Sequence, residues 1–209
     1  MLRNWLLVCL IALTGCFGSK APEEKKVTEV GVDPKKDPLG ALGALGQMAK
    51  DAEKAQKEME NMPAVDPVHF SKLIEALPEA PGGWKADEAK GESSQMGEWK
   101  ISQASRNYQQ EGGEGHVKVT IHDWAYNRGL YLPFLMQANF SQESTDGYSK
   151  GIKMGDDPGR EEYNVKNHDG KRNVLVHKRY NVEVAIDNQD AKALDEWWSR
   201  IKLSGLPVK

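Results

Sequence analysis

Alternation of apolar and polar residues marks the strands that this chain is expected to form. In residues 116–125, Val117, Val119 and Ile121 alternate with polar side chains, which is the period of a half-buried strand. We predict strands over residues 98–108, 116–125, 148–154, 160–166, 172–177 and 180–186. Because the turns between neighbouring strands are short, these strands are expected to pair antiparallel.

Two helices are expected in the second half of the chain. Residues 130–140 are apolar nearly all round and have Pro133 in their first turn, which predicts a buried helix. A final helix is expected to begin at a cap near Asp187 or Asn188. Its apolar positions have the spacing i, i+3, i+4 and i+7 and are Leu194, Trp197, Trp198 and Ile201. The order β-β-α-β-β-β-β-α predicts the α+β class, an antiparallel sheet of about six strands with helices packed on it.

The first third of the chain follows other patterns. Ten of the residues 17–38 are charged and three are proline, so residues 16–38 are predicted to be a disordered tether. Residues 39–62 open with a period-three repeat of leucine and glycine and continue with a weak alanine-rich stripe, which predicts a spacer helix. That helix is either solvated or offers a surface to a bilayer or to a second copy of the chain. A short helix is expected at 68–77, and the globular domain is expected over 66–209.

The start of the chain has the pattern of an export signal. Residues 5–13 form an unbroken apolar run after a single positive charge at Arg3. Nine helical residues rise only about 14 Å, against a hydrocarbon core of about 30 Å, so this run is too short to span a bilayer and is typical of a signal peptide. The run leads into the four-residue motif Leu13-Thr14-Gly15-Cys16.

This motif resembles the lipobox of bacterial lipoproteins. The resemblance implies that residues 1–15 are a signal peptide, cleaved between Gly15 and Cys16, and that the Cys16 thiol receives a diacylglycerol. The new amino group would usually be acylated as well, and two or three acyl chains anchor a protein stably. The expected location is therefore the bacterial cell envelope. Phe17 after the cysteine, in place of aspartate, favours the outer membrane in a cell that has two membranes.

The composition mainly excludes classes of protein and kinds of site. The 209 residues are 39% hydrophobic and 28% charged with a net charge of -3, which suits an ordinary globular protein and argues against a nucleic-acid binder. Of the two cysteines, Cys9 falls in the predicted signal peptide and Cys16 would carry lipid. No cysteine is then left in the domain for a disulfide or a metal site.

A serine motif supplies the best candidate for catalysis. Residues 147–151 fit the pattern G-x-S-x-G of a nucleophile elbow around Ser149, and His168 and His177 follow downstream. An elbow needs a buried strand before the serine and a helix after it, whereas here a polar segment precedes it and a Pro-Gly turn follows closely. We keep these three residues as the candidate set of an alternative, a hydrolase whose site is assembled from dispersed residues.

Candidate metal ligands are sparse. His116 and His122 share a strand face but lie about 20 Å apart, too far to share an ion. A local acidic cluster consists of Asp156, Asp157, Glu161 and Glu162. It lacks the alternating oxygen ligands and central glycine of a calcium loop and is explained as a turn. We therefore expect no bound metal and no cofactor.

Adjacent tryptophans give the best candidate for a contact surface. Trp197 and Trp198 cannot both face inward equally from one helix, so one partly exposed indole could contact a ligand or a partner. The alternative is that both indoles lie along the seam between the helix and the sheet.

The predicted order of elements resembles the PsbP and Mog1 group of small α+β domains, a likeness of fold that implies little about function. The leading hypothesis is a membrane-anchored envelope lipoprotein that acts by binding or assembly and not as an enzyme. Its expected partners are the membrane, through Cys16, and an unknown envelope protein or small ligand, with no nucleic acid. Self-association through residues 39–62 is a third hypothesis.

Overall fold

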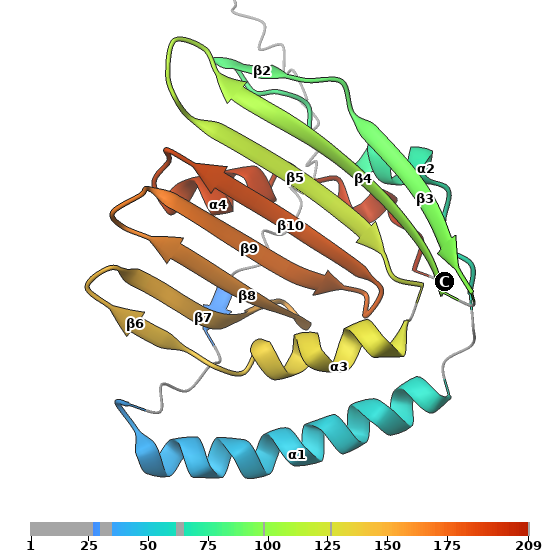
Figure 1. The fold of residues 1–209 in the computed structure, drawn as a ribbon, viewed down its shortest axis with the longest axis vertical. Helices are drawn as coiled ribbons and strands as arrows, with labels where there is room; N and C mark the ends of the chain where they lie inside the picture. The colour runs from blue at the N-terminus through green and yellow to red at the C-terminus, as the bar shows by residue number, and fades with distance from the viewer. Residues whose placement is uncertain (1–26, 30–34, 62–64, 98, 126, 209) are drawn as a thin grey trace, which may run out of the picture.

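The computed structural model describes residues 27–29, 35–61, 65–97, 99–125 and 127–208. The predicted signal peptide, the lipobox and Cys16 lie outside these residues. The described residues belong to the α+β class: one open antiparallel sheet carries helices on both of its faces (Figure 1). None of the helices described is both long and apolar enough to cross a membrane.

The six strands expected from alternation are all present, with shifted ends. They are β4 (Trp99–Gln110), β5 (His116–Asp123), β7 (Gly147–Met154), β8 (Asp157–Asn164), β9 (Asp169–Val176) and β10 (Tyr180–Asp187). Their order in the sheet is β7-β8-β9-β10-β5-β4, and every pair is antiparallel. The segment 155–159 is not one turn as expected, because β8 already begins at Asp157 and pairs with the end of β7.

The predicted number of strands is wrong, because the described residues form ten. The four additional strands are β1 (Val27–Glu29), β2 (Trp84–Ala86), β3 (Lys90–Met96) and β6 (Gln142–Ser144). Strands β2 and β3 both pair with β4, and β1 and β6 both pair with β7, so all four lie at the two edges of the sheet. Edge strands exposed to water need no apolar alternation, and β3 and β6 are almost wholly polar.

Strand β1 also corrects the predicted tether. Val27–Glu29 lies within residues 16–38, which were expected to be disordered, yet it pairs with the end of β7. An ion pair of 2.7 Å between Lys150 Nζ and Glu29 Oε1 supports this pairing. The chain is therefore attached to the sheet before the first helix begins.

The described residues form four α-helices. They are α1 (Pro38–Glu60), α2 (Phe70–Ala76), α3 (Arg128–Gln137) and α4 (Lys192–Trp198). Helix α1 is the expected spacer helix; proline suits its first position, and the Asp37 side chain caps it by accepting a hydrogen bond of 2.8 Å from the Gly40 amide. Helix α4 begins later than the predicted Asp187 or Asn188, because β10 continues through Asp187.

One face of the sheet carries the main core. Along β10, Tyr180, Val182, Val184 and Ile186 are buried on this face, and antiparallel register places the apolar residues of β5 and β9 beside them. Helices α2 and α4 pack over these side chains (Figure 1). Burial of these apolar side chains is the dominant stabilising contribution to the fold, although the same layer also contains buried Arg172 opposite Val184.

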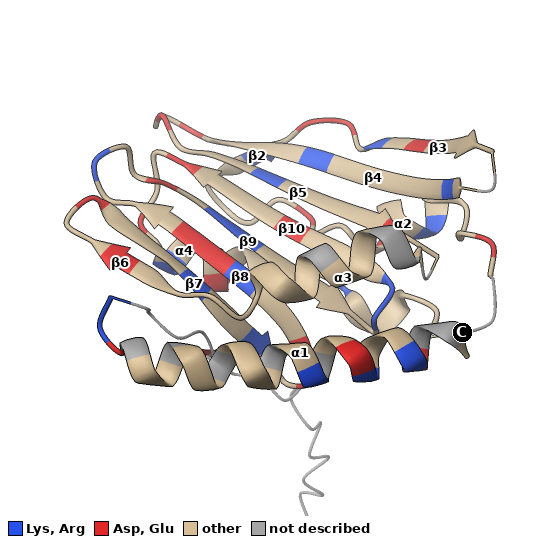
Figure 2. Cartoon of the chain, turned by 60° about the horizontal axis from the view of Figure 1, so that its bottom comes forward, with Lys and Arg blue, Asp and Glu red and all other residues tan. Residues whose placement is uncertain are grey.

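The opposite face is polar over most of its area. Helices α1 and α3 lie on it near one end of the strands, where Ala55, Tyr131 and Leu175 form a small second cluster (Figures 1 and 2). Helix α3 is not the all-round buried helix that its composition predicts: Met136 is 55% exposed. The helix covers part of a sheet face and is itself covered only in part.

A buried ion pair lies at the end of the core where β5 ends. Arg179 donates from Nε and from a terminal nitrogen to the two oxygens of Asp123, at 2.8 and 2.7 Å, and both side chains are buried. Asp123 also accepts the amides of Val68 and Ala125. Each buried charge is thus paired, as a low-dielectric environment requires.

Candidate functional site

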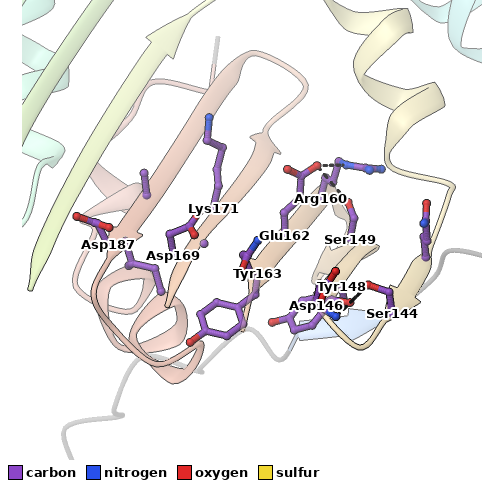
Figure 3. Close-up of a pocket in the computed structure, with 16 residues that line it drawn as sticks. Ser144, Asp146, Tyr148, Ser149, Arg160, Glu162, Tyr163, Asp169, Lys171 and Asp187 are labelled. Carbon is purple, nitrogen blue, oxygen red and sulfur yellow. Dashed lines mark hydrogen bonds and ion pairs between the residues drawn. The ribbon is translucent and has the colours of Figure 1, made fainter. Parts of the chain in front are cut away.

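The uncovered part of the polar face contains a groove. A cavity of about 780 Å³ is lined by residues of β6, β7, β8, β9 and β10 (Figure 3). A second hollow of about 380 Å³ extends toward β4 and β5 and shares Ala185, Ile186 and Asp187 with the first. The two hollows adjoin at these shared residues, and we call them together the open-face groove.

Strand register determines which side chains form the groove floor. Ser149 lies opposite Glu162, which lies opposite Lys171 on the next strand. The same row continues through Ala185 and Lys118 toward β4. Directly opposed side chains on one face lie about 5 Å apart, so residues of five strands form one row that is polar at every position except Ala185.

Glu162 is the best-organised anion of this row. Figure 3 shows its carboxylate between Arg160 and Ser149: Arg160 Nε donates to Glu162 Oε1 at 2.7 Å, and the Ser149 hydroxyl donates to the same oxygen at 3.1 Å. The Arg160 hydrogen bond, aided by that of Ser149, lowers the pKa of Glu162 below its ordinary value although partial burial opposes the shift. Glu162 is therefore a carboxylate at neutral pH, held in a defined orientation.

Other charges in the groove are less fully paired. Lys171 lies 3.5 Å from Glu183, a loose ion pair. Neither Lys118 nor Asp187 has an ion-pair partner among the described residues, and Asp169 Oδ1 is buried without a hydrogen bond there. A groove with cationic and anionic groups that still have bonding capacity suits a polar ligand carrying both kinds of group.

Comparisons with known protein families, with curated proteins and with solved structures found no match to this chain. The resemblance of its fold to PsbP and Mog1 domains therefore stays a prediction. What the groove does has to be inferred from its own residues.

The three hydrolase candidates are not brought together. Ser149 lies inside β7 and its hydroxyl bonds to Glu162, so it is not on a strand-to-helix turn. His168 lies in the turn before β9, and His177 lies in the turn after it. A strand of eight residues spans roughly 25 Å, so these two histidines lie at opposite ends of the sheet.

The residues of the acidic cluster have separate structural roles. Asp157 accepts a hydrogen bond of 3.0 Å from the His177 amide, and Glu161 forms a buried ion pair with Arg172. Glu161 and Glu162 are consecutive in β8 and therefore point to opposite faces. Among the described residues, no three His, Cys, Asp or Glu side chains are grouped as a metal site.

Both candidate tryptophans belong to the core, as the alternative of a helix-sheet seam predicts, and neither is the partly exposed indole of the contact hypothesis. Trp197 is 2% exposed and Trp198 is 6% exposed. The Trp197 ring packs edge-on against Trp84 at 5.1 Å and lies 4.4 Å from Tyr108. Helix α4 is short and lies close to the sheet, so it buries two adjacent indoles at the helix-sheet seam, and neither is available to a partner.

Sequence reasoning missed most of the groove. Lys171, Asp187 and Lys118 come from three strands and form no motif along the chain. The available signal was the polar half of each alternating strand, which sets out a second face of the sheet. The polar positions of a strand do not predict whether helices cover that face of the sheet. In this structure α1 and α3 cover only part of it.

Proposed function

We propose that this chain is a membrane-anchored bacterial envelope lipoprotein that acts without catalysis, by binding a polar partner in its open-face groove. The observation that supports the binding part is the row of side chains from Ser149 to Lys118 on an uncovered sheet face, which is polar at every position except Ala185. These groups contribute little to the core, so their arrangement has no structural explanation in burial. The partner is an envelope protein or a small ligand that bears both charged and hydrogen-bonding groups.

The anchor rests on the lipobox-like motif that ends at Cys16. Growth with an alkyne fatty acid should label the protein, and Cys16→Ser should abolish the label, because a hydroxyl is not the thiol that the transfer requires. The matched control is Cys9→Ser, which should retain the label. Equal labelling of the Cys16→Ser variant would refute the anchor.

Separation of Ser149, His168 and His177 supports binding over the alternative, an envelope hydrolase. A serine nucleophile needs a base within hydrogen-bond reach, and the partner of the Ser149 hydroxyl is a carboxylate already paired with Arg160. Absence of labelling at Ser149 by a serine-directed phosphonate is the expected result. Labelling that depends on either histidine would favour the hydrolase.

Crosslinking in intact cells tests the binding site. A benzophenone amino acid in place of Lys171 should capture one abundant neighbour, because position 171 is on the groove floor. The matched control replaces Lys192, an exposed lysine of α4 on the other side of the sheet. A product specific to position 171 supports the proposal, whereas equal products at both positions, or a product only at 192, would contradict it.

A further inference from the structure

Helix α1 changes character along its length. Its first half exposes three leucines: Leu39 is 81% exposed, Leu42 is 66% exposed and Leu45 is 51% exposed. Its second half exposes charged side chains that form ion pairs, among them Lys57 with Glu53. In Figure 2 the first half of α1 is mostly uncharged and the second half carries blue and red bands.

The second half of α1 is the part that holds the helix on the domain. Ala55 is buried against Tyr131 and Leu175, and Glu58 pairs with Lys178 of the β9–β10 turn at 2.6 Å. This pair lowers the pKa of Glu58 through the Lys178 hydrogen bond. The first half has three large apolar side chains in water instead, which is an unfavourable arrangement unless something covers them.

The exposed leucines lie at the edge of the sheet where the chain enters. Lys36, two residues before α1, pairs with Glu143 of β6. Strands β6 and β1 are both hydrogen-bonded to β7. The start of α1 and the first described strand are therefore attached to the same edge strand.

The attachment of β1 shortens the link to the anchor. If Cys16 carries lipid, only residues 17–26 separate it from β1, in place of the longer tether 17–38 expected from the sequence. Eleven residue steps reach at most about 40 Å even when fully extended. The β7 edge of the sheet, and with it the leucine end of α1, is consequently confined near the bilayer surface.

We propose that Leu39, Leu42 and Leu45 insert into the surface of the lipid bilayer, so that the first half of α1 docks the domain on the membrane while its charged half stays in water. This inference rests on the lipid anchor of the proposed function. Gly40, Gly43 and Gly46 fit such docking, because a residue without a side chain lets neighbouring leucines reach the acyl region. A bilayer is favoured over a second copy of the chain because the short link from Cys16 brings this surface to the membrane.

The test uses the mature lipidated protein, in which signal cleavage would remove Cys9 and the lipid would occupy the Cys16 sulfur, so that an introduced cysteine is the only free thiol. A nitroxide label is attached at Leu39→Cys or at Lys57→Cys. The two positions lie about five helical turns apart on the same side of α1 and form a matched pair. The protein is reconstituted in vesicles of phosphatidylethanolamine and phosphatidylglycerol, and collisions of the label with oxygen and with a water-soluble nickel chelate are measured.

The expected result is a several-fold lower nickel collision rate, with a higher oxygen collision rate, at position 39 than at position 57. Changing both Leu42 and Leu45 to Gln should remove this difference while fatty-acid labelling of Cys16 persists. Equal nickel access at 39 and 57 in protein that carries the lipid would overturn the docking inference and leave the anchor intact. Label-label broadening at position 39 without vesicles would also overturn it, in favour of self-association. Loss of fatty-acid labelling would instead refute the anchor.

Discussion

The two faces of the sheet differ in how far they are covered, and neighbouring residues of β10 illustrate the difference. Val184 is fully buried beneath the helices of the core face, whereas Glu183, the residue before it, is half-buried on the other face and pairs loosely with Lys171. The core face is covered by α2 and α4, and the open face is covered only where α1 and α3 lie on it. We attribute stability to the core face and propose binding for the open face of the same strands.

The largest expected effect is a charge on the core face. Val182→Asp would bury a carboxylate opposite Val174 and Ile121, where neither neighbouring strand offers a cation, and we expect a loss of more than about 4 kcal/mol, enough to unfold a domain of ordinary stability. Glu183→Gln on the open face is the matched control and should change the free energy of unfolding by less than about 1 kcal/mol. Urea unfolding followed by tryptophan fluorescence measures both, and similar losses would show that the two faces do not differ as described.

A somewhat smaller effect is expected at the buried ion pair. Arg179→Met leaves the Asp123 carboxylate buried with backbone amides as its remaining donors, and should cost about 3–5 kcal/mol. Lys100→Met breaks an exposed ion pair with Asp66 and should cost less than about 1 kcal/mol. The same urea titration distinguishes them. If Arg179→Met lowered the free energy of unfolding as little as Lys100→Met, the Arg179–Asp123 pair would not be a buried part of the core.

The core face could be predicted from the sequence in much more detail than the open face. Alternation in β5 and β10 identifies Val119, Val182 and Val184 as buried, because packing requires apolar residues at every second position. The edge strands escaped prediction because β3 and β6 have no buried side to impose such a pattern. Strand β1 escaped because its three residues lie in a charged, proline-containing segment whose pairing depends on the distant β7.

The candidate site was less predictable still. The GxSxG match identifies Ser149, which does line the groove. The sequence places its hydrogen-bond partner Glu162 in a local acidic cluster that is explained as a turn, and so does not predict their contact. Bringing Glu162 and Lys171 together requires the register between β8 and β9, which single-chain patterns do not specify. For Trp197 and Trp198 the sequence left two interpretations open, and the structure agrees with the one in which the helix-sheet seam covers both indoles.

The smallest effect concerns pH at the covered part of the open face. Burial lowers the pKa of His122 below its ordinary value, opposed by Glu183. Because the folded pKa is lower, the unfolded chain binds more protons at His122 as the pH falls, and the free energy of unfolding decreases. Stability is therefore full above the ordinary histidine pKa of about 6.5 and is lost as the pH falls through the lower, folded pKa. His122→Gln should reduce the loss of stability between about pH 7.5 and about pH 5.5.

Denaturant midpoints at the two pH values measure this loss in the wild-type chain and in the variant. His116→Gln, at an exposed position on the same face of β5, is the control and should leave the loss unchanged. An unaltered pH dependence in His122→Gln would show that burial does not lower the pKa of His122.

The central claim is that the open-face groove is one binding site and that its side chains lie on the sheet face opposite the main core. A benzophenone amino acid at position 118 lies at the β5 end of the groove, and Lys171→Glu reverses a charge on β9, separated from position 118 by Ala185 of β10. In intact cells the crosslink from position 118 should fall several-fold with Lys171→Glu and should persist with Lys192→Glu. Both variants should stay folded, and the urea midpoint of Lys171→Glu should fall slightly, because its carboxylate lies opposite Glu162 and beside Glu183. A crosslink at 118 that is indifferent to Lys171→Glu, or that is lost equally with Lys192→Glu, would contradict the account.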